Sequence, residues 1–363
     1  MNSYLTRLIA RMQKLETYSI QSESNPISYR EDILYLDSNE NLQLSKTFLK
    51  SILDTSVSNT DPRMYSSISY HSLILNLSEY LGIQKDEIVI GSGADGLIEL
   101  IAGSVMTPDD AALIIEPTFS MYRNLLSAHR RKYRELRLRE DFSLDIEKVR
   151  ESLCGTDEVI FLCSPNNPSG NQFAREDVKT LLESTEGLVL LDEAYVEFAS
   201  DTLIDLVKEY ENLFVLRTFS KAFGLAGLRV GYAVTNENLA RTLREKICLP
   251  YPVSTLAASV ASLLLENITQ IDATIEIVKK TRTRLIKGLE KIQGVRVFPS
   301  QGNFILIEIP RSASIVAKQL LDLGIKVRII DRIRKDAYFI RVTIPPIEEL
   351  ERVVRIFKEV LSK

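Results

Sequence analysis

The chain has 363 residues with 45 Lys or Arg and 49 Asp or Glu, so its formal net charge is −4. This balance lacks the basic excess of many nucleic-acid-binding proteins, and no apolar run approaches the roughly 18 residues that a membrane helix requires. Two histidines exclude a histidine-rich metal centre, and three widely spaced cysteines favour neither a zinc knuckle nor a disulfide framework, so we expect a reduced, cytoplasmic protein without a metal site.

Residues 1–32 are expected to form an N-terminal arm that begins with an amphipathic helix. Residues 33–248 are expected to form a large domain, because apolar runs alternate there with stretches of helical spacing. Runs that are apolar on both faces and separated by helices indicate a mostly parallel sheet covered on both sides. The expected strands are 87–91, 111–116, 158–163, 187–192, 213–218 and 229–234, and the helical stretches between them include 95–106, 145–153 and 175–184.

The pattern changes near the sequence LPYP (249–252), after which residues 249–363 are expected to form a smaller domain. A long helical stretch at 255–292 is followed by short apolar runs and helical segments, which predicts an α+β unit. The predicted fold class is therefore α/β: a mostly parallel sheet flanked by helices, with a smaller α+β C-terminal domain.

A glycine-rich turn, GSGADG (91–96), follows an expected strand and opens an expected helix. Glu116 ends the next strand, where a dinucleotide-binding fold places the acid that binds ribose. Small residues at a helix N-terminus expose amides to any phosphate, so the turn alone fits NAD, another phosphorylated ligand or a purely structural role.

Further polar clusters follow the next strands, at the sheet edge where α/β proteins bind ligands. Asp192 ends a strongly apolar run, where it either caps the next helix or meets a buried partner. Lys221 stands among Ala, Phe and Leu, surroundings that suit an amine of lowered pKa fit for a Schiff base. Nearby hydroxyls and Arg229 are able to bind a phosphate. The clusters are SPNNPSG (164–170), DEAY (192–195) and RTFSKAFGLAGLR (217–229).

The ordered set SPNNPSG, LDEAY and TFSKAFGLAGLR resembles the fold-type I pyridoxal 5'-phosphate (PLP) aminotransferases of class I/II. Within that class it is most similar to the histidinol-phosphate aminotransferase group. The resemblance implies a PLP enzyme, working as a homodimer, that moves an amino group between histidinol phosphate and 2-oxoglutarate. It extends through DSNEN (37–41), EPTFSMY (116–122), PYPVS (250–254), QGNF (301–304) and FIRVT (339–343).

The resemblance also implies roles for individual residues around the cofactor. Lys221 bonds to PLP and then moves the substrate proton, while Asp192 pairs with the ring nitrogen and keeps it protonated. Asn167 and Tyr195 bind the phenolic oxygen, and Phe119 stacks on the ring. The phosphate is assigned to Ala94, Asp95, Thr218, Ser220 and Arg229, with Tyr65 reaching it from the neighbouring subunit.

Substrate contacts are implied for Arg341, Arg328, Asn39 and Tyr18, of which the two arginines suit a carboxylate or a phosphate equally. Departures from the family pattern at Leu42, at 63–66 and at 345–346 leave the substrate open. An aromatic or other amino-acid aminotransferase and a threonine-phosphate decarboxylase remain alternatives. An NAD-dependent oxidoreductase is a remote alternative that leaves Lys221 without a role.

Overall fold

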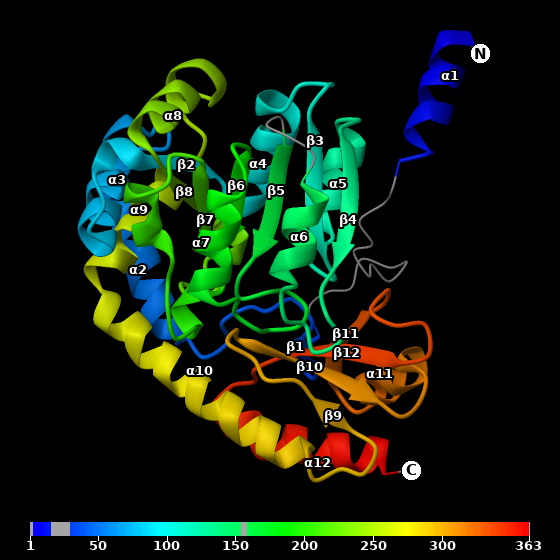
Figure 1. Ribbon diagram of the computed structural model, residues 1–363. Helices are drawn as coiled ribbons and strands as arrows, with labels where there is room; N and C mark the ends of the chain where they lie inside the picture. Colours follow the sequence, from blue (N-terminus) through cyan, green and yellow to red (C-terminus); the bar gives the residue numbers. More distant parts are fainter. Residues whose placement is uncertain (1–2, 16–29, 154–157, 363) are drawn as a thin grey trace.

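The computed structural model describes residues 3–15, 30–153 and 158–362. In it the chain forms two β-sheets with helices packed against them (Figure 1). Across these described ranges, no helix is long and apolar enough to cross a bilayer. The predicted α/β class is confirmed by the larger sheet, which is mostly parallel and carries helices on both faces.

The larger sheet has seven strands. In their order across the sheet they are β2 (Ile88–Ser92), β8 (Val230–Thr235), β7 (Leu213–Thr218), β6 (Leu188–Asp192), β5 (Glu158–Cys163), β3 (Ala111–Glu116) and β4 (Lys132–Arg137). The five strands from β7 to β4 run parallel, whereas β8 is antiparallel to both of its neighbours.

The six strands expected in this region form within one residue of their predicted bounds, because each is apolar on both faces. In β5, Val159 and Phe161 pack in one apolar cluster and Ile160 and Leu162 in the other. Strand β4 was not predicted. Its sequence, KYRELR, is polar and half-exposed because it lies at the sheet edge, where one side needs no apolar cover.

Helices cover the two faces of this sheet separately. One apolar cluster joins the sheet to α4 (Gly93–Leu100), α5 (Met121–Ala128) and α8 (Glu237–Thr242). The opposite cluster joins it to α2 (Lys46–Asn59), α3 (Ser67–Leu81), α6 (Ile146–Ser152), α7 (Arg175–Glu183) and α9 (Thr255–Glu266). The inner strands are therefore enclosed, and their ends remain free for ligands.

The smaller sheet has five strands, and its first strand comes from the other end of the chain. In order these are β1 (Leu34–Leu36), β11 (Ile325–Ile330), β12 (Tyr338–Thr343), β10 (Phe304–Ile309) and β9 (Arg296–Val297). Strand β1 is parallel to β11, and the other pairs are antiparallel. Its helices are α11 (Ala313–Asp322) and α12 (Leu350–Leu361), and the N-terminal segment contains α1 (Ser3–Met12).

The stretch expected to be helical at 255–292 forms two helices, because the chain leaves helical geometry at Asn267. The second of them, α10 (Ile268–Leu289), runs from the larger sheet to the smaller one (Figure 1). A domain boundary near residue 249 stays a proposal, and the pairing of β1 with β11 ties the start of the expected large domain to the smaller sheet.

Short helical turns complete the fold. They are η1 (Lys85–Glu87), η2 (Ile101–Val105), η3 (Val196–Phe198), η4 (Ile204–Lys208), η5 (Ala226–Leu228), η6 (Leu243–Ile247) and η7 (Ile347–Glu349). Of these, η5 follows the loop that carries Lys221 and precedes Arg229, which has a left-handed φ of 54°. Lys221 before the turn and Arg229 after it both line one cavity.

Candidate active site

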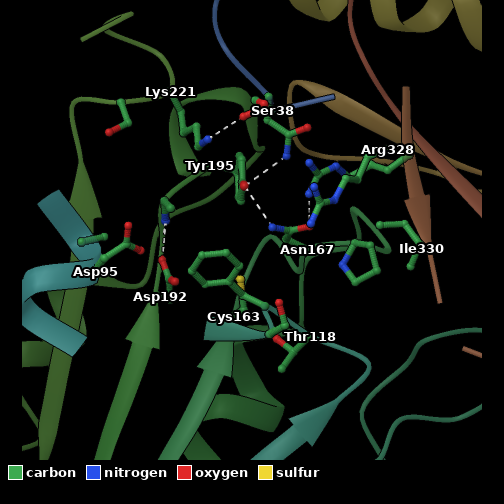
Figure 2. Close-up of a pocket in the computed structure, with 18 of the residues that line it drawn as sticks. Ser38, Asp95, Thr118, Cys163, Asn167, Asp192, Tyr195, Lys221, Arg328 and Ile330 are labelled. Carbon is green, nitrogen blue, oxygen red and sulfur yellow. Dashed lines mark hydrogen bonds between the residues drawn. The ribbon is translucent and has the colours of Figure 1, made fainter. Parts of the chain in front are cut away.

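A cavity of 670 Å³ lies between the two sheets. The larger sheet contributes the carboxyl ends of β3, β5, β6 and β7 and the first turn of α4, and the smaller sheet contributes β11 and β12. Figure 2 shows Lys221 and Asp192 on the side of the larger sheet and Arg328 entering from a strand of the smaller sheet. The predicted site residues that line it are Asn39, Ala94, Asp95, Phe119, Asn167, Asp192, Tyr195, Thr218, Ser220, Lys221, Arg229, Arg328 and Arg341.

Lys221 follows β7 in a loop whose neighbours Ala222 and Phe223 are fully buried. Its Nζ donates a hydrogen bond to the carbonyl oxygen of Ser38 at 2.9 Å and lies 5.7 Å from the centre of the Tyr195 ring. Burial, helped by the nearby positive charge of Arg341, lowers the Lys221 pKa to about 8. A sizeable fraction of this amine is therefore neutral near physiological pH and able to act as a nucleophile.

Asp192 ends β6 and is only 3% exposed. Its Oδ2 accepts a hydrogen bond from Tyr122 Oη at 2.6 Å, and its Oδ1 accepts one from the backbone N–H of Ala194 at 2.9 Å. Burial raises the pKa of Asp192 to about 6, against the lowering effect of these two donors. Because both donors are neutral, the carboxylate can still pair with a positively charged nitrogen in the cavity.

A hydrogen-bonded network connects the Tyr195 hydroxyl to the smaller sheet. This hydroxyl accepts from Asn39 Nδ2 at 3.1 Å and from Asn167 Nδ2 at 3.2 Å. Arg341 Nη1 donates to Asn167 Oδ1 at 2.6 Å, and its Nη2 donates to the carbonyl oxygen of Asp37 at 2.6 Å. Burial raises the pKa of Tyr195, which keeps its hydroxyl protonated and available as a donor to a ligand.

The opposite end of the cavity can hold an anion. Thr218 Oγ1 lies 3.0 Å from Ser220 Oγ, and Arg229 Nη2 lies 2.9 Å from Asp95 Oδ2. At the start of α4, the amides of Ala94 and Asp95 have no acceptor within their own helix. These hydroxyls, amides and guanidinium are the donor set that a phosphate prefers.

We call this set of hydroxyls, amides and guanidinium the anion cradle. Glycine is required on both sides of it. A Cβ on Gly231 of β8 would lie 2.6 Å from the amide nitrogen of Ala94, and a Cβ on Gly93 would lie 2.6 Å from Arg229 Nη2. Gly93 also has a φ of 72°, which other residues adopt only with strain. The glycine-rich turn therefore brings the helix N-terminus against the sheet and makes room for the arginine.

The arrangement fits the cofactor that the resemblance implies. A buried carboxylate suits the ring nitrogen, the amine of Lys221 suits the aldehyde, and the donor cradle suits the phosphate. Phe119, placed edge-on to Tyr122 with ring centres 5.7 Å apart, adds an aromatic wall. The residues present therefore match each polar group of PLP with a side chain of suitable chemistry.

Arg328 and Arg341 lie opposite each other on the antiparallel strands β11 and β12. Directly opposed residues point to the same face of a sheet, so both arginines face the cavity. Arg341 is 8% exposed and hydrogen-bonded, which fixes its guanidinium. The two side chains together provide a positively charged wall for a substrate anion.

One predicted residue among those described lies elsewhere. Tyr65 is 78% exposed, stacks on Tyr251 with ring centres 4.7 Å apart, and does not line the cavity of its own chain. Tyr18 falls outside the described residues. The histidines are also remote from the cavity lining, with His129 lying 3.6 Å from Glu99 at the surface.

The topology does not support the dinucleotide interpretation of the glycine-rich turn. In that fold the strand before the turn pairs with the next strand in sequence. Here β2 lies at one edge and pairs with β8, while β3 pairs with β4 and β5. Glu116 instead accepts from the backbone N–H of Thr118 at 3.1 Å and lies 3.4 Å from Arg123.

Sequence reasoning missed Tyr122, Ser38 and Glu40. Tyr122 belongs to the EPTFSMY segment but is 70 residues from Asp192, so no local spacing relates the two. Ser38 contributes only its backbone carbonyl oxygen, so the identity of its side chain gives no signal of this contact. Glu40 lies in the DSNEN segment, where only Asn39 was selected, and lines the cavity beside it.

Comparisons with known proteins agree with this geometry. A family model described as aminotransferase class I and II matches residues 31–357. The chain is 35% identical over 343 residues to a histidinol-phosphate aminotransferase of Thermoanaerobacter pseudethanolicus, spanning 93% of this chain and 95% of that protein. It is 39% identical over 346 residues to one of Methanosarcina mazei, spanning 94% and 90%. The solved histidinol-phosphate aminotransferase of Clostridium acetobutylicum has a TM-score of 0.80 at 27% identity, covering 90% of this chain and 99% of that one.

Proposed function

Because the chain belongs to the aminotransferase class I and II family, whose members depend on PLP, we propose that it transfers an amino group from histidinol phosphate to 2-oxoglutarate. The observation that carries the reaction class is the amine of Lys221, set between a buried carboxylate and an anion cradle. The choice of donor is supported by the relatives at 35% and 39% identity that bear this name.

Asp192 would hold a proton on the ring nitrogen, and Thr218, Ser220 and Arg229 would hold the phosphate. PLP, when bound, supplies a ring that accepts the electrons released at the substrate carbon. Asn167 and Tyr195 would donate hydrogen bonds to the phenolic oxygen. These contacts would position the ring beside Lys221.

Lys221 would perform the acid–base chemistry once the substrate amine has displaced it. Its Nζ would take up the proton released at the substrate carbon and hold it for return to the substrate–cofactor adduct. A pKa of about 8 suits this role, because the amine must both accept and release a proton near neutral pH.

Arg341 and Arg328 would bind the anionic end of each substrate. Donor phosphate and acceptor carboxylate would occupy the same place in the two halves of the reaction, since a guanidinium can bind either in bidentate geometry. The fixed position of Arg341, bonded to Asn167, links substrate anion binding to the residues around the phenolic oxygen.

A homodimer is proposed from the surface around Tyr65. Five large apolar side chains are exposed there: Met64, Tyr65, Ile68, Leu249 and Tyr251. A patch of this kind marks a protein interface, and a second copy of the chain would bring Tyr65 to the neighbouring phosphate cradle. The cytoplasm remains the location predicted from the cysteine pattern.

Chemical trapping tests the cofactor assignment. Sodium borohydride should reduce the bond between PLP and Lys221 to a stable amine, adding the cofactor's mass to the peptide that contains residue 221. Lys221→Ala protein treated in the same way should carry no such mass. Labelling that persists in this variant would refute the assignment of Lys221.

Turnover of alternative donors tests the substrate. We expect histidinol phosphate to be converted far more efficiently than phenylalanine or tyrosine, and threonine phosphate to release no carbon dioxide. Efficient conversion of the aromatic acids with negligible conversion of histidinol phosphate would replace the proposed donor by the aromatic alternative. Release of carbon dioxide would indicate the decarboxylase.

A further inference from the structure

Glu40 lines the cavity and has no role in the chemistry described above. Its side chain is half-buried beside Asn39 in the segment that follows β1. Among the residues that the structure describes, no side chain or backbone group makes a hydrogen bond or ion pair with it. A carboxylate that has lost part of its hydration without gaining a partner is costly, which is a reason to look for a ligand.

The segment around Glu40 is firmly held. The carbonyl oxygen of Ser38 accepts from Lys221 Nζ at 2.9 Å, and Asn41 Nδ2 donates to the carbonyl oxygen of Ala222 at 2.8 Å. Asn39 donates to Tyr195, and its own carbonyl oxygen accepts from Asn303 Nδ2 at 2.9 Å. The backbone that carries Glu40 is therefore held beside the reacting amine by its neighbours on both sides.

The electrostatic surroundings indicate a cationic ligand. Burial raises the pKa of Glu40, while the charge of Lys221 acts in the opposite direction. Asp37 and Lys326 also act on it, with opposite signs. When Lys221 is bonded to the cofactor, its nitrogen is no longer a free ammonium group that can pair with Glu40. A protonated nitrogen on the substrate would replace it.

We propose that Glu40 is a substrate-binding residue that accepts a hydrogen bond from a protonated nitrogen of the amino donor. The proposal rests on the aminotransferase activity proposed above. The two substrates differ in this respect: the donor carries a cationic nitrogen, whereas the oxo-acid acceptor carries only negative charge. Arg328 and Arg341 attract both substrates alike, and Glu40 distinguishes them.

The test compares Glu40→Gln with the loaded wild-type enzyme in single-turnover half-reactions. Glutamine keeps the shape and removes the charge, so the half-saturating concentration of histidinol phosphate should rise about tenfold, the loss expected for one charged hydrogen bond. The value for 2-oxoglutarate should stay unchanged or fall. Glu31→Gln, which removes an exposed acid before β1, is the matched control and should change neither value.

Histidinol phosphate has two nitrogens that could contact Glu40, the α-ammonium group and the imidazole. Free glutamate, used as the amino donor of the reverse half-reaction, distinguishes them because it has an α-ammonium group but no imidazole ring. If the half-saturating concentrations of both donors rise in Glu40→Gln, the contact is with the α-ammonium group. If only that of histidinol phosphate rises, the contact is with the imidazole. Equal changes for donors and acceptor, or none, would overturn the proposal. If histidinol phosphate does not react at all, the proposed donor fails, and the glutamate half-reaction still decides the role of Glu40.

A binding measurement keeps the test independent of turnover. Succinate carries two carboxylates and no nitrogen, so its affinity for the loaded Glu40→Gln enzyme should equal or exceed that for wild type. Weaker binding of succinate would contradict the proposal. If Glu40→Gln does not fold, Glu40→Asp is the alternative variant, because it keeps the charge on a shorter side chain. In this variant the half-saturating concentration of the donors should rise by less than the tenfold expected when the charge is lost.

Discussion

Replacing Tyr122 by Phe removes a single hydroxyl from the interior of the site. That hydroxyl donates to Asp192 Oδ2 at 2.6 Å, and both residues are buried. The ring itself packs on Phe119 and Phe161, with centres 5.7 and 5.2 Å away, and these contacts survive the change. The substitution therefore isolates the effect of one hydrogen bond on the carboxylate.

The expected magnitude follows from the charge of the acceptor. A hydrogen bond to a charged group contributes about 1.5–3 kcal/mol, and one pKa unit corresponds to about 1.4 kcal/mol, so the pKa of Asp192 should rise by about one to two units. The direction is upward because the hydroxyl stabilises the ionised form. Starting from about 6, the carboxyl group of the variant would be largely protonated at pH 7.

Cofactor release gives the assay. At pH 7 we expect Tyr122→Phe to bind PLP about tenfold more weakly than wild type does, because a neutral carboxyl group pairs poorly with a protonated ring nitrogen. At pH 9 the carboxyl ionises in both proteins, and the difference should shrink. Tyr210→Phe, which removes a 2.7 Å bond to Glu183 outside the cavity, is the control. An equal deficit at both pH values would refute the electrostatic reasoning.

Three further substitutions follow from the described contacts. In cofactor-free Arg341→Gln, the pKa of Lys221 should rise above about 8 because a nearby positive charge is lost. The midpoint of the pH–rate profile for PLP attachment should therefore move to higher pH. An unchanged midpoint would mean that burial alone sets the pKa of Lys221. Gly231→Ala should lower stability by about 1–3 kcal/mol in urea unfolding and weaken phosphate binding, because the new Cβ meets Gly93 and the start of α4; wild-type stability would show that the turn can move away. Tyr65→Ala should weaken PLP retention, and mixing it with Lys221→Ala should recover activity in mixed dimers, whereas no recovery would count against a shared site.

Residues near strand ends could be predicted well from the sequence. Asp192, Thr218 and Lys221 follow apolar runs, and the carboxyl ends of parallel strands meet at one edge whatever the order of the strands. Local sequence is therefore sufficient to place these groups together. The apolar content of each run also specifies its burial, which is why six strands of the larger sheet were found.

Pairings between distant segments could not be predicted from local periodicity. The position of β2 beside β8, which removes the dinucleotide interpretation, is a property of the assembled sheet. The bond from Tyr122 to Asp192 likewise depends on a side chain of α5 reaching the end of β6, which is separate from it in the sequence. Edge strand β4 escaped prediction for a different reason, since its polar sequence is compatible with exposed helix, strand or loop.

The attachment of β1 to β11 also has a consequence for how the protein is made. The amide of Asn39 donates to Thr343 Oγ1, 304 residues later, and within the described part of the chain β11 is the one strand that pairs with β1. During synthesis at about 5–20 residues per second, the segment carrying Asn39 and Glu40 would wait roughly 15–60 s for these partners to emerge. The two sides of the cavity therefore come together only after residues 325–343 have been synthesised, and a nascent chain halted before β11 would lack the strands that carry Arg328 and Arg341.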